Sequence, residues 1–186
     1  AAARIEAEML FLEKYQYANA EDEFQAILLK SRDPLALYGM ARAVWGRGDF
    51  ARAHAFCEEA LKDRPGMEEP LLMLAFLSLW DQDPAEALKL TGEVLLKNPE
   101  CEEALVLQAA ISFVAGRADE GQALMARAEG VRPRWSEACR IVAGVMESWH
   151  RSRESILWLE KGLRIFPEDP GLQGELGDIL MHPSRE

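Results

Sequence analysis

Few side chains in this chain could carry out covalent chemistry. His54 and Cys57 lie three positions apart, a spacing that puts both on one face of a helix, where an imidazole could activate a thiol. Position 57, however, recurs along the chain as one where helices pack, so we interpret Cys57 as structural. His150 and His182 have no set of metal ligands near them in the sequence. The sequence therefore predicts no catalytic residue, no metal site and no cofactor, and we expect the protein not to be an enzyme.

The tripeptide Arg47-Gly48-Asp49 is a cell-adhesion signal in other proteins. Here a structural role accounts for it fully. Gly48 can end one helix, Asp49 can cap the next, and Phe50 begins the packing of that second helix. We therefore interpret the tripeptide as a helix–helix turn.

Composition and charge limit the kinds of partner that the protein could bind. The chain has 186 residues, 49% of them apolar, and a formal net charge of −11. It can bury a core, and its acidity argues against binding nucleic acid or an anionic membrane, which attract basic surfaces. Adjacent acids at 68–69 and 102–103 begin predicted helices, where they interact favourably with the helix dipole. Every stretch of 18 residues contains charges, so we expect no membrane insertion.

The number and spacing of the cysteines indicate the cellular compartment. Cys57, Cys101 and Cys139 are odd in number and widely spaced, which fits neither a disulfide framework nor a zinc site. We expect them to be reduced and structural, which favours the cytoplasm. The sequence opens AAARIEAEML, without the charged-then-apolar layout of a signal peptide. If this start results from processing or truncation, a periplasmic location is the alternative.

Along the whole chain, prolines mark an internal repeat of 34 residues, at Pro65, Pro99, Pro133 and Pro167. Small residues recur with the same period in one column, Ala41, Ala75, Ala109, Ala143 and Gly177, and in a second, Ala53, Ala87, Gly121 and Ser155, with Ala20 as an earlier member. A third column holds Leu37, Leu71, Leu105 and Cys139. A period of this length is typical of stacked supersecondary units.

Each unit is predicted to form two helices, because apolar residues recur at three- and four-residue intervals with few β-branched runs. One small-residue column falls on each helix, where it lets two helices cross closely. The proline follows the second helix and stops it from continuing.

These features together resemble the tetratricopeptide repeat family. The stretch LALYGMARAVWGRGDFARAHAFCEEALKDRP, residues 35–65, has the aromatic-rich first helix, the Gly-Asp-aromatic turn and the terminal proline of that family. Later copies drift, with Gly121 and Glu129 at columns that usually hold Ala and an apolar residue. The resemblance implies an all-α fold, a right-handed α-solenoid of about five helix–turn–helix repeats followed by a C-terminal cap helix.

We predict a single array over residues 1–186. Residues 1–33 form a degenerate first repeat, the in-register repeats are 34–67, 68–101, 102–135 and 136–169, and residues 170–182 form the cap helix.

The resemblance also implies a concave groove lined by the first helix of each repeat. Its inward-facing positions give the candidate partner-binding residues Leu35, Tyr38, Arg42, Trp45, Leu72, Met73, Phe76, Leu79, Trp80, Val106, Leu107, Ala110 and Phe113. At the same positions the fifth repeat becomes polar and includes Arg140. Groove positions of chaperone-binding members carry Lys, Arg and Asn to clamp a carboxylate, whereas the matching residues here are mostly apolar, so that clamp is not expected.

The predicted helix 68–80 is apolar nearly all round, and such a helix requires cover on every side. The repeat core uses Leu71, Leu74 and Ala75, which leaves further apolar residues for the groove. A contiguous apolar surface marks a binding site. Two forms of self-burial remain as alternatives, either a predicted N-terminal helix at 4–15 folded over the groove or a second copy of the chain.

We therefore expect a non-enzymatic interaction scaffold whose groove holds an amphipathic helix or extended apolar segment of another protein. A bacterial export chaperone for hydrophobic cargo is one alternative, because such chaperones include small acidic tetratricopeptide proteins. A structural homo-oligomer assembled through the same groove is the other.

Overall fold

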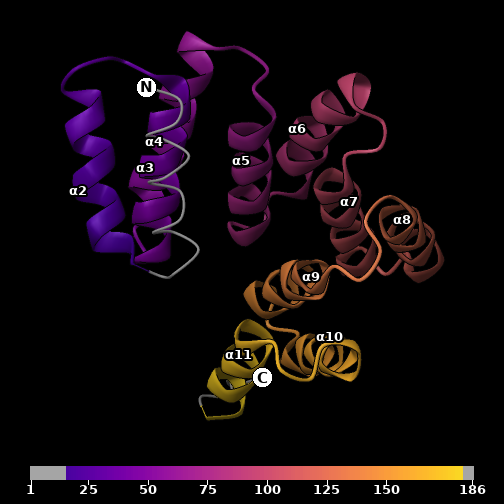
Figure 1. Ribbon diagram of the computed structural model, residues 1–186. Helices are drawn as coiled ribbons and strands as arrows, with labels where there is room; N and C mark the ends of the chain where they lie inside the picture. The colour runs from indigo at the N-terminus through magenta and orange to yellow at the C-terminus, as the bar shows by residue number, and fades with distance from the viewer. Residues whose placement is uncertain (1–15, 182–186) are drawn as a thin grey trace. The chain divides into compact units, whose positions relative to one another are not determined.

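The computed structural model describes residues 16–181, and within them the chain forms ten helices and no strands (Figure 1). The helices are α2 (Tyr17–Leu28), α3 (Pro34–Gly46), α4 (Phe50–Asp63), α5 (Glu68–Trp80), α6 (Pro84–Lys97), α7 (Glu102–Val114), α8 (Ala118–Val131), α9 (Ser136–Ser148), α10 (Ser152–Ile165) and α11 (Pro170–Met181). The prediction of an all-helical fold built from helix–turn–helix repeats is confirmed. The predicted helix at 4–15 lies outside the described residues.

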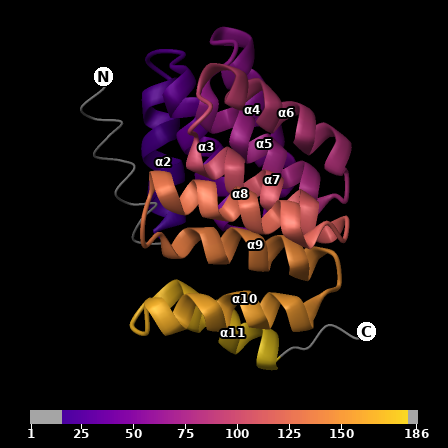
Figure 2. The ribbon, with the colours of Figure 1, turned by 90° about the vertical axis from the view of Figure 1, so that its right-hand side faces the viewer.

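Each in-register repeat that we predicted contains one pair of helices, and α11 begins where the predicted cap begins. The helices group into two compact units, which meet within α5 between Leu77 and Ser78. In the first unit α3 packs against α2 and α4 (Figure 1). In the second unit α7 packs against α6, α8 and α9, and α10 packs against α9 and α11 (Figure 2). The boundaries of a single array stay a prediction.

The small-residue columns are buried between the helices. The four alanines of the first column are at most 1% exposed, and Ala20, Ala53, Ala87 and Ser155 of the second column are fully buried. The helix-ending prolines also act as expected, since each stands two positions after the last residue of α4, α6, α8 or α10.

In the first unit, aromatic rings of α2 occupy the space that glycines leave on α3. A Cβ atom on Gly39 would overlap the ring of Phe24, and one on Gly46 would overlap the ring of Tyr17. Phe24 is fully buried in a cluster with Ala36, Met40 and Ala43. The absence of a side chain at Gly39 and at Gly46 therefore fixes how closely α2 approaches α3.

The turn between the two helices of each repeat has one conformation throughout. Position 48 and its equivalents adopt a positive φ, at Gly48 (82°), Gln82 (60°), Gly116 (76°) and His150 (56°). The following N–H donates to the carbonyl five residues earlier each time, as in Asp49 to Val44 (2.9 Å) and Arg151 to Met146 (2.9 Å). This is the hydrogen-bond pattern of a Schellman C-cap. The tripeptide at 47–49 is thus a helix-ending turn.

Aspartates cap several of the helices. The carboxylate of Asp49 accepts the N–H of Arg52 at 3.1 Å, that of Asp83 accepts from Glu86 at 3.1 Å, and that of Asp33 accepts from Leu35 at 2.9 Å. Arg47 and Arg52 both pair with Glu21 of α2, at 2.6 and 2.8 Å. The tripeptide's two charged side chains are therefore engaged within the first unit.

The cap helix α11 is joined to α9 by an ion pair. Arg140 Nε donates to Glu175 Oε1 at 2.8 Å, and Arg140 Nη1 donates to Glu137 at 2.7 Å. Burial raises the pKa of the Glu175 carboxyl above its usual 4.5, and Arg140 only partly offsets that rise. Folding therefore makes the Glu175 carboxyl easier to protonate than it is in the unfolded chain.

We expect the conformation at position 116 to be strained for any residue with a Cβ. A Cβ there would meet nothing within 4 Å, so Gly116→Ala should lower the free energy of unfolding by about 1 kcal/mol through the backbone alone. His150→Gly, at the equivalent position, should raise it by up to about 1 kcal/mol. Urea denaturation of both variants measures these changes. As a control, Gly92→Ala inside α6 should stabilise by about 1 kcal/mol. A loss of stability in His150→Gly would contradict the conclusion that the positive φ at this turn position strains a residue with a Cβ.

The raised pKa of Glu175 predicts a pH dependence. Its protonated form gives stability that is fully present below pH 4.5 and is lost as the pH rises through the higher pKa of the folded state. Glu175→Gln does not titrate, so the variant should gain in melting temperature relative to the wild type as the pH rises from 4.5. Thermal unfolding across this range tests the trend. A difference that stays constant with pH would show that burial does not govern this carboxyl.

Candidate partner-binding surface

The predicted surface residues of α3 lie on one part-exposed face. Leu35, Tyr38, Arg42 and Trp45 are all half-buried, and their spacing of three and four residues puts them along a single side of the helix. The rest of α3 is largely core, including Ala36, Leu37, Met40, Ala41, Ala43 and Val44. The four residues thus form a continuous stripe bounded by buried residues.

Helix α5 adds two residues to this stripe in the first unit. Met73 and Phe76 are half-buried, and the rings of Trp45 and Phe76 meet edge to face with centroids 6.0 Å apart. Trp45 and Met73 both pack against the buried cluster of Val44, Ala53 and Leu77. We call Leu35, Tyr38, Arg42, Trp45, Met73 and Phe76 the aromatic strip.

Not every predicted residue of α5 is accessible. Leu72 is 7% exposed and Leu79 is fully buried, whereas Trp80, on the last turn, is 37% exposed. Leu72 and Leu79 therefore do not line an open surface. Trp80 keeps its accessibility, but it belongs to the second unit and is separate from the aromatic strip.

The predicted surface of α7 is enclosed, which corrects the sequence-based interpretation. Val106 and Ala110 are fully buried and Leu107 is 3% exposed. The reason is that α7 packs against α6, α8 and α9, so its apolar residues have helices on several sides. Phe113 is half-buried but lies against Gly121 of α8 and Trp158 of α10, with ring centroids 5.2 Å apart in the latter pair.

Hydrogen bonds also join the C-terminal end of α5 to that of α9, although a whole repeat separates these two helices in the sequence. Trp149 Nε1 donates to the carbonyl oxygen of Leu79 at 2.9 Å, and the side-chain amide of Gln82 donates to the carbonyl of Ser148 at 3.1 Å. Sequence analysis missed this contact. The sequence feature that could have indicated the contact is Trp149 itself. The equivalent turn positions hold Arg47, Asp81 and Ala115, which are more compatible with exposure to solvent than an indole is.

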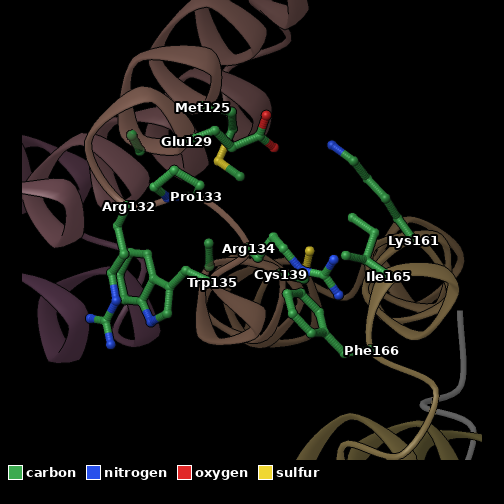
Figure 3. Close-up of a pocket in the computed structure, with 12 residues that line it drawn as sticks. Met125, Glu129, Arg132, Pro133, Arg134, Trp135, Cys139, Lys161, Ile165 and Phe166 are labelled. Carbon is green, nitrogen blue, oxygen red and sulfur yellow. The ribbon is translucent and has the colours of Figure 1, made fainter.

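A pocket of about 320 Å³ lies elsewhere in the second unit, between α8, the start of α9, and α10 (Figure 3). Its apolar lining comprises Met125, Ala128, Ala138, Cys139, Ile165 and Phe166. Four charged residues complete it, namely Glu129, Arg132, Arg134 and Lys161, together with the ring of Trp135. Sequence analysis did not predict this pocket, although it noted Glu129 as a departure from the repeat.

The described residues hold no side-chain cluster suited to a metal ion, and the cysteine singled out in the sequence is buried. No group of three His, Cys, Asp or Glu side chains within residues 16–181 could hold a metal ion. Burial raises the pKa of the Cys57 thiol to about 12, so this thiol is unreactive near neutral pH. His54 instead lies 3.8 Å from the carboxylate of Glu58 on the exposed side of α4. No helix in the described part of the chain is long and apolar enough to cross a bilayer.

The fold and the strip together define an α-helical repeat protein with a part-exposed apolar surface. The model of the tetratricopeptide repeat family matches residues 44–111, which agrees with the predicted resemblance. Tetratricopeptide repeats mediate protein–protein interactions, and proteins of this fold are generally non-enzymatic scaffolds.

Solved structures share the fold at low sequence identity. The tetratricopeptide repeat protein TTC0263 of Thermus thermophilus aligns with a TM-score of 0.71 and 19% identity, over 97% of this chain and 98% of that one. A MamA structure (AMB-1) aligns with a TM-score of 0.59 and 19% identity, over 87% and 96% of the two chains. YrrB, described as having an unusual peptide-binding site, aligns with a TM-score of 0.55 and 18% identity, over 92% and 89%. No curated protein matches the sequence.

The indole hydrogen bond of Trp149 gives a testable contribution to stability. Trp149→Phe keeps a ring but removes the donor to Leu79, so we expect the free energy of unfolding to fall by about 1 kcal/mol. Urea denaturation followed by circular dichroism measures it. Gln82→Ala, which loses a hydrogen bond exposed to solvent, should cost less. Equal stability of wild type and Trp149→Phe would mean that this contact does not hold the second unit together.

Proposed function

We propose that the protein is a non-enzymatic interaction module that binds an apolar segment of another protein on the aromatic strip. The observation that carries the proposal is the set of five large apolar side chains, all half-buried, that lie together on α3 and α5 of the first unit. Aromatic side chains offer large contact areas at little entropic cost, and methionine adapts to irregular partners. The tetratricopeptide repeat fold supports the same class of function.

The strip also indicates the chemistry of its partner. Arg42 is the one charged residue of the strip and lies a turn away from both Tyr38 and Trp45 along α3. Its guanidinium can donate hydrogen bonds to a carboxylate or to the free carbonyls at a helix end. We therefore expect an amphipathic helix or extended segment with bulky apolar side chains and at least one acceptor group.

The size of the strip bounds the affinity. Completing the burial of one half-buried large side chain contributes roughly 1 kcal/mol, so the five together give about 5 kcal/mol, and a matching apolar face on the partner about as much again. Association itself costs several kcal/mol in lost freedom. Binding is therefore expected in the micromolar range rather than the nanomolar range.

Charges placed on the accessible aromatic residues of α5, half-buried Phe76 and exposed Trp80, should abolish this binding. Phe76→Glu puts a carboxylate within the strip, and Trp80→Glu adds a second charge on the last turn of the same helix, so we expect loss of proteins that wild type retains in a quantitative pull-down. The matched control is Leu29→Glu with Leu96→Glu, since these leucines, directly after α2 and within α6, are 82% and 86% exposed. Circular dichroism should show the helical signal of all three proteins to be alike. An unchanged set of retained proteins in the Phe76/Trp80 variant would contradict the proposal.

Self-association is the competing use of the same surface, and molar mass separates the two. Light scattering behind size exclusion, at several concentrations, compares wild type with the same two variants. A wild-type monomer supports a foreign partner. A wild-type dimer that becomes monomeric in the Phe76/Trp80 variant, but not in the leucine control, would assign the surface to homo-oligomer assembly instead.

A further inference from the structure

The pocket between α8 and α10 is chemically distinct from the aromatic strip. Its interior is apolar, with Ala138 and Cys139 of α9 only 5% and 6% exposed and Met125 of α8 only 3% exposed. Figure 3 shows Met125 and Glu129 on one side and Lys161, Ile165 and Phe166 on the other, with Cys139 between them. At about 320 Å³, it is at the small end of the range for ligand sites, a size suited to one large side chain.

The pocket exists because one repeat lacks a packing residue. Position 129 is equivalent to Leu61, Leu95 and Leu163 in the other repeats, and all three leucines are half-buried. Glu129 is exposed instead, because a carboxylate is not buried among apolar groups without a partner. The apolar lining of the pocket, which includes Phe166, is therefore not covered by an apolar side chain at position 129.

The rim of the pocket is basic in a strongly acidic chain. It carries Arg132, Arg134 and Lys161 against the single carboxylate of Glu129, whereas the whole chain has a net charge of −11. Two of these cations stand at positions that are acidic in two of the other three repeats. Arg134 stands where other repeats have Gly66, Glu100 and Glu168, and Lys161 stands where they have Glu59, Glu93 and Arg127.

Two of the rim cations, Lys161 and Arg134, lie over aromatic rings. Lys161 Nζ lies 4.5 Å from the ring centroid of Trp158, and the guanidinium carbon of Arg134 lies 5.7 Å from that of Phe166. A cation–π contact orients a cation but leaves its full charge and its N–H donors available to an anion. Arg132 differs, since it also pairs with Glu102 at 3.5 Å.

The backbone at Arg134 supports a functional interpretation. Arg134 has a φ of 59°, a conformation that costs a non-glycine residue about 1 kcal/mol, and the equivalent Gly66 adopts a similar φ of 77° without that cost. An arginine in place of the easier glycine puts a positive charge at the mouth of the pocket. Strained backbone is enriched at ligand sites, and here it coincides with the mouth of a pocket.

We propose that this pocket binds an acidic segment of a partner protein, with one large apolar side chain inside the pocket and flanking carboxylates on Arg134 and Lys161. Charge complementarity selects this occupant, because an acidic segment is repelled by most of the chain and attracted to this rim. The site goes beyond the proposed function, since it lies in the second unit and shares no residue with the aromatic strip.

The test uses the blocked pentapeptide acetyl-Asp-Glu-Phe-Glu-Asp-amide and isothermal titration calorimetry with the full chain. Two control peptides replace Phe by Gly, or replace the acids by Asn and Gln. Wild type is expected to bind the first peptide at least about 10-fold more tightly than either control, because both the apolar and the charged parts contribute. Equal affinity for all three peptides, or no binding by wild type, would overturn the proposal.

Two variants weaken the site without weakening the fold. Glu129→Leu restores the leucine of the repeat and fills the pocket, and Arg134→Gly removes the charge and relieves the positive φ. Both should be at least as stable as wild type in urea, while each lowers affinity for the peptide at least about 5-fold. Arg64→Ala, an equal change in net charge at an exposed position of the first unit, should bind within about 2-fold of wild type. Unchanged affinity in Glu129→Leu would overturn the assignment of the pocket.

The aromatic strip and the pocket can fail independently. The Phe76/Trp80 double Glu variant should bind the pentapeptide with wild-type affinity if the pocket is the site. A loss of peptide binding in that variant, with its fold intact, would instead place the peptide on the strip and overturn the pocket proposal.

Discussion

The close crossing of helices at residues with little or no side chain is the constraint on which the rest of this structure depends. The alanines at 41, 75, 109 and 143 and their partners on the second helices are buried almost completely. Interiors at this packing density cannot admit another methyl group without moving a helix. Where the chain uses glycine, as at Gly39 and Gly121, an aromatic ring from a neighbouring helix fills the place of the side chain. The repeat period is thus a consequence of packing.

The parts of the fold that could be predicted from sequence are those that depend on local physics. The helix bounds follow from periodicity, capping aspartates and terminal prolines, and the turn at Gly48 follows from the freedom of glycine. At Gln82 and His150 the same turn forms without glycine. Its two backbone hydrogen bonds and the packing of the helices on either side hold those residues in a conformation that their own preferences disfavour. Residue type alone could not show this, whereas the 34-residue register could.

The candidate surface was predictable in α3 but not in α7, and the difference is physical. Both helices carry apolar residues at equivalent positions, such as Tyr38 and Val106. Periodicity tells which face of a helix an apolar residue occupies, but not whether another helix covers that face. In α7 the cover comes partly from α9, and the contact from Trp149 to Leu79 joins residues 70 positions apart. Such distant contacts leave only indirect traces in a sequence, here a tryptophan at a turn position.

The pocket shows how a repeat protein can acquire a site by giving up a packing residue. At position 129 a leucine would bury apolar surface, and at position 134 a glycine would remove backbone strain, so the chain carries two locally unfavourable residues beside one cavity. Natural sequences are locally consistent except where function imposes a cost. Glu129 and Arg134 also have related effects on the cavity, because the first leaves it more open and the second makes its rim more charged. Positive φ at a non-glycine residue also occurs at Gln82 and His150, where the recurring helix-ending turn accounts for it. At Arg134 the strained residue instead adjoins the cavity, so a ligand of that cavity is the reason that we propose for it.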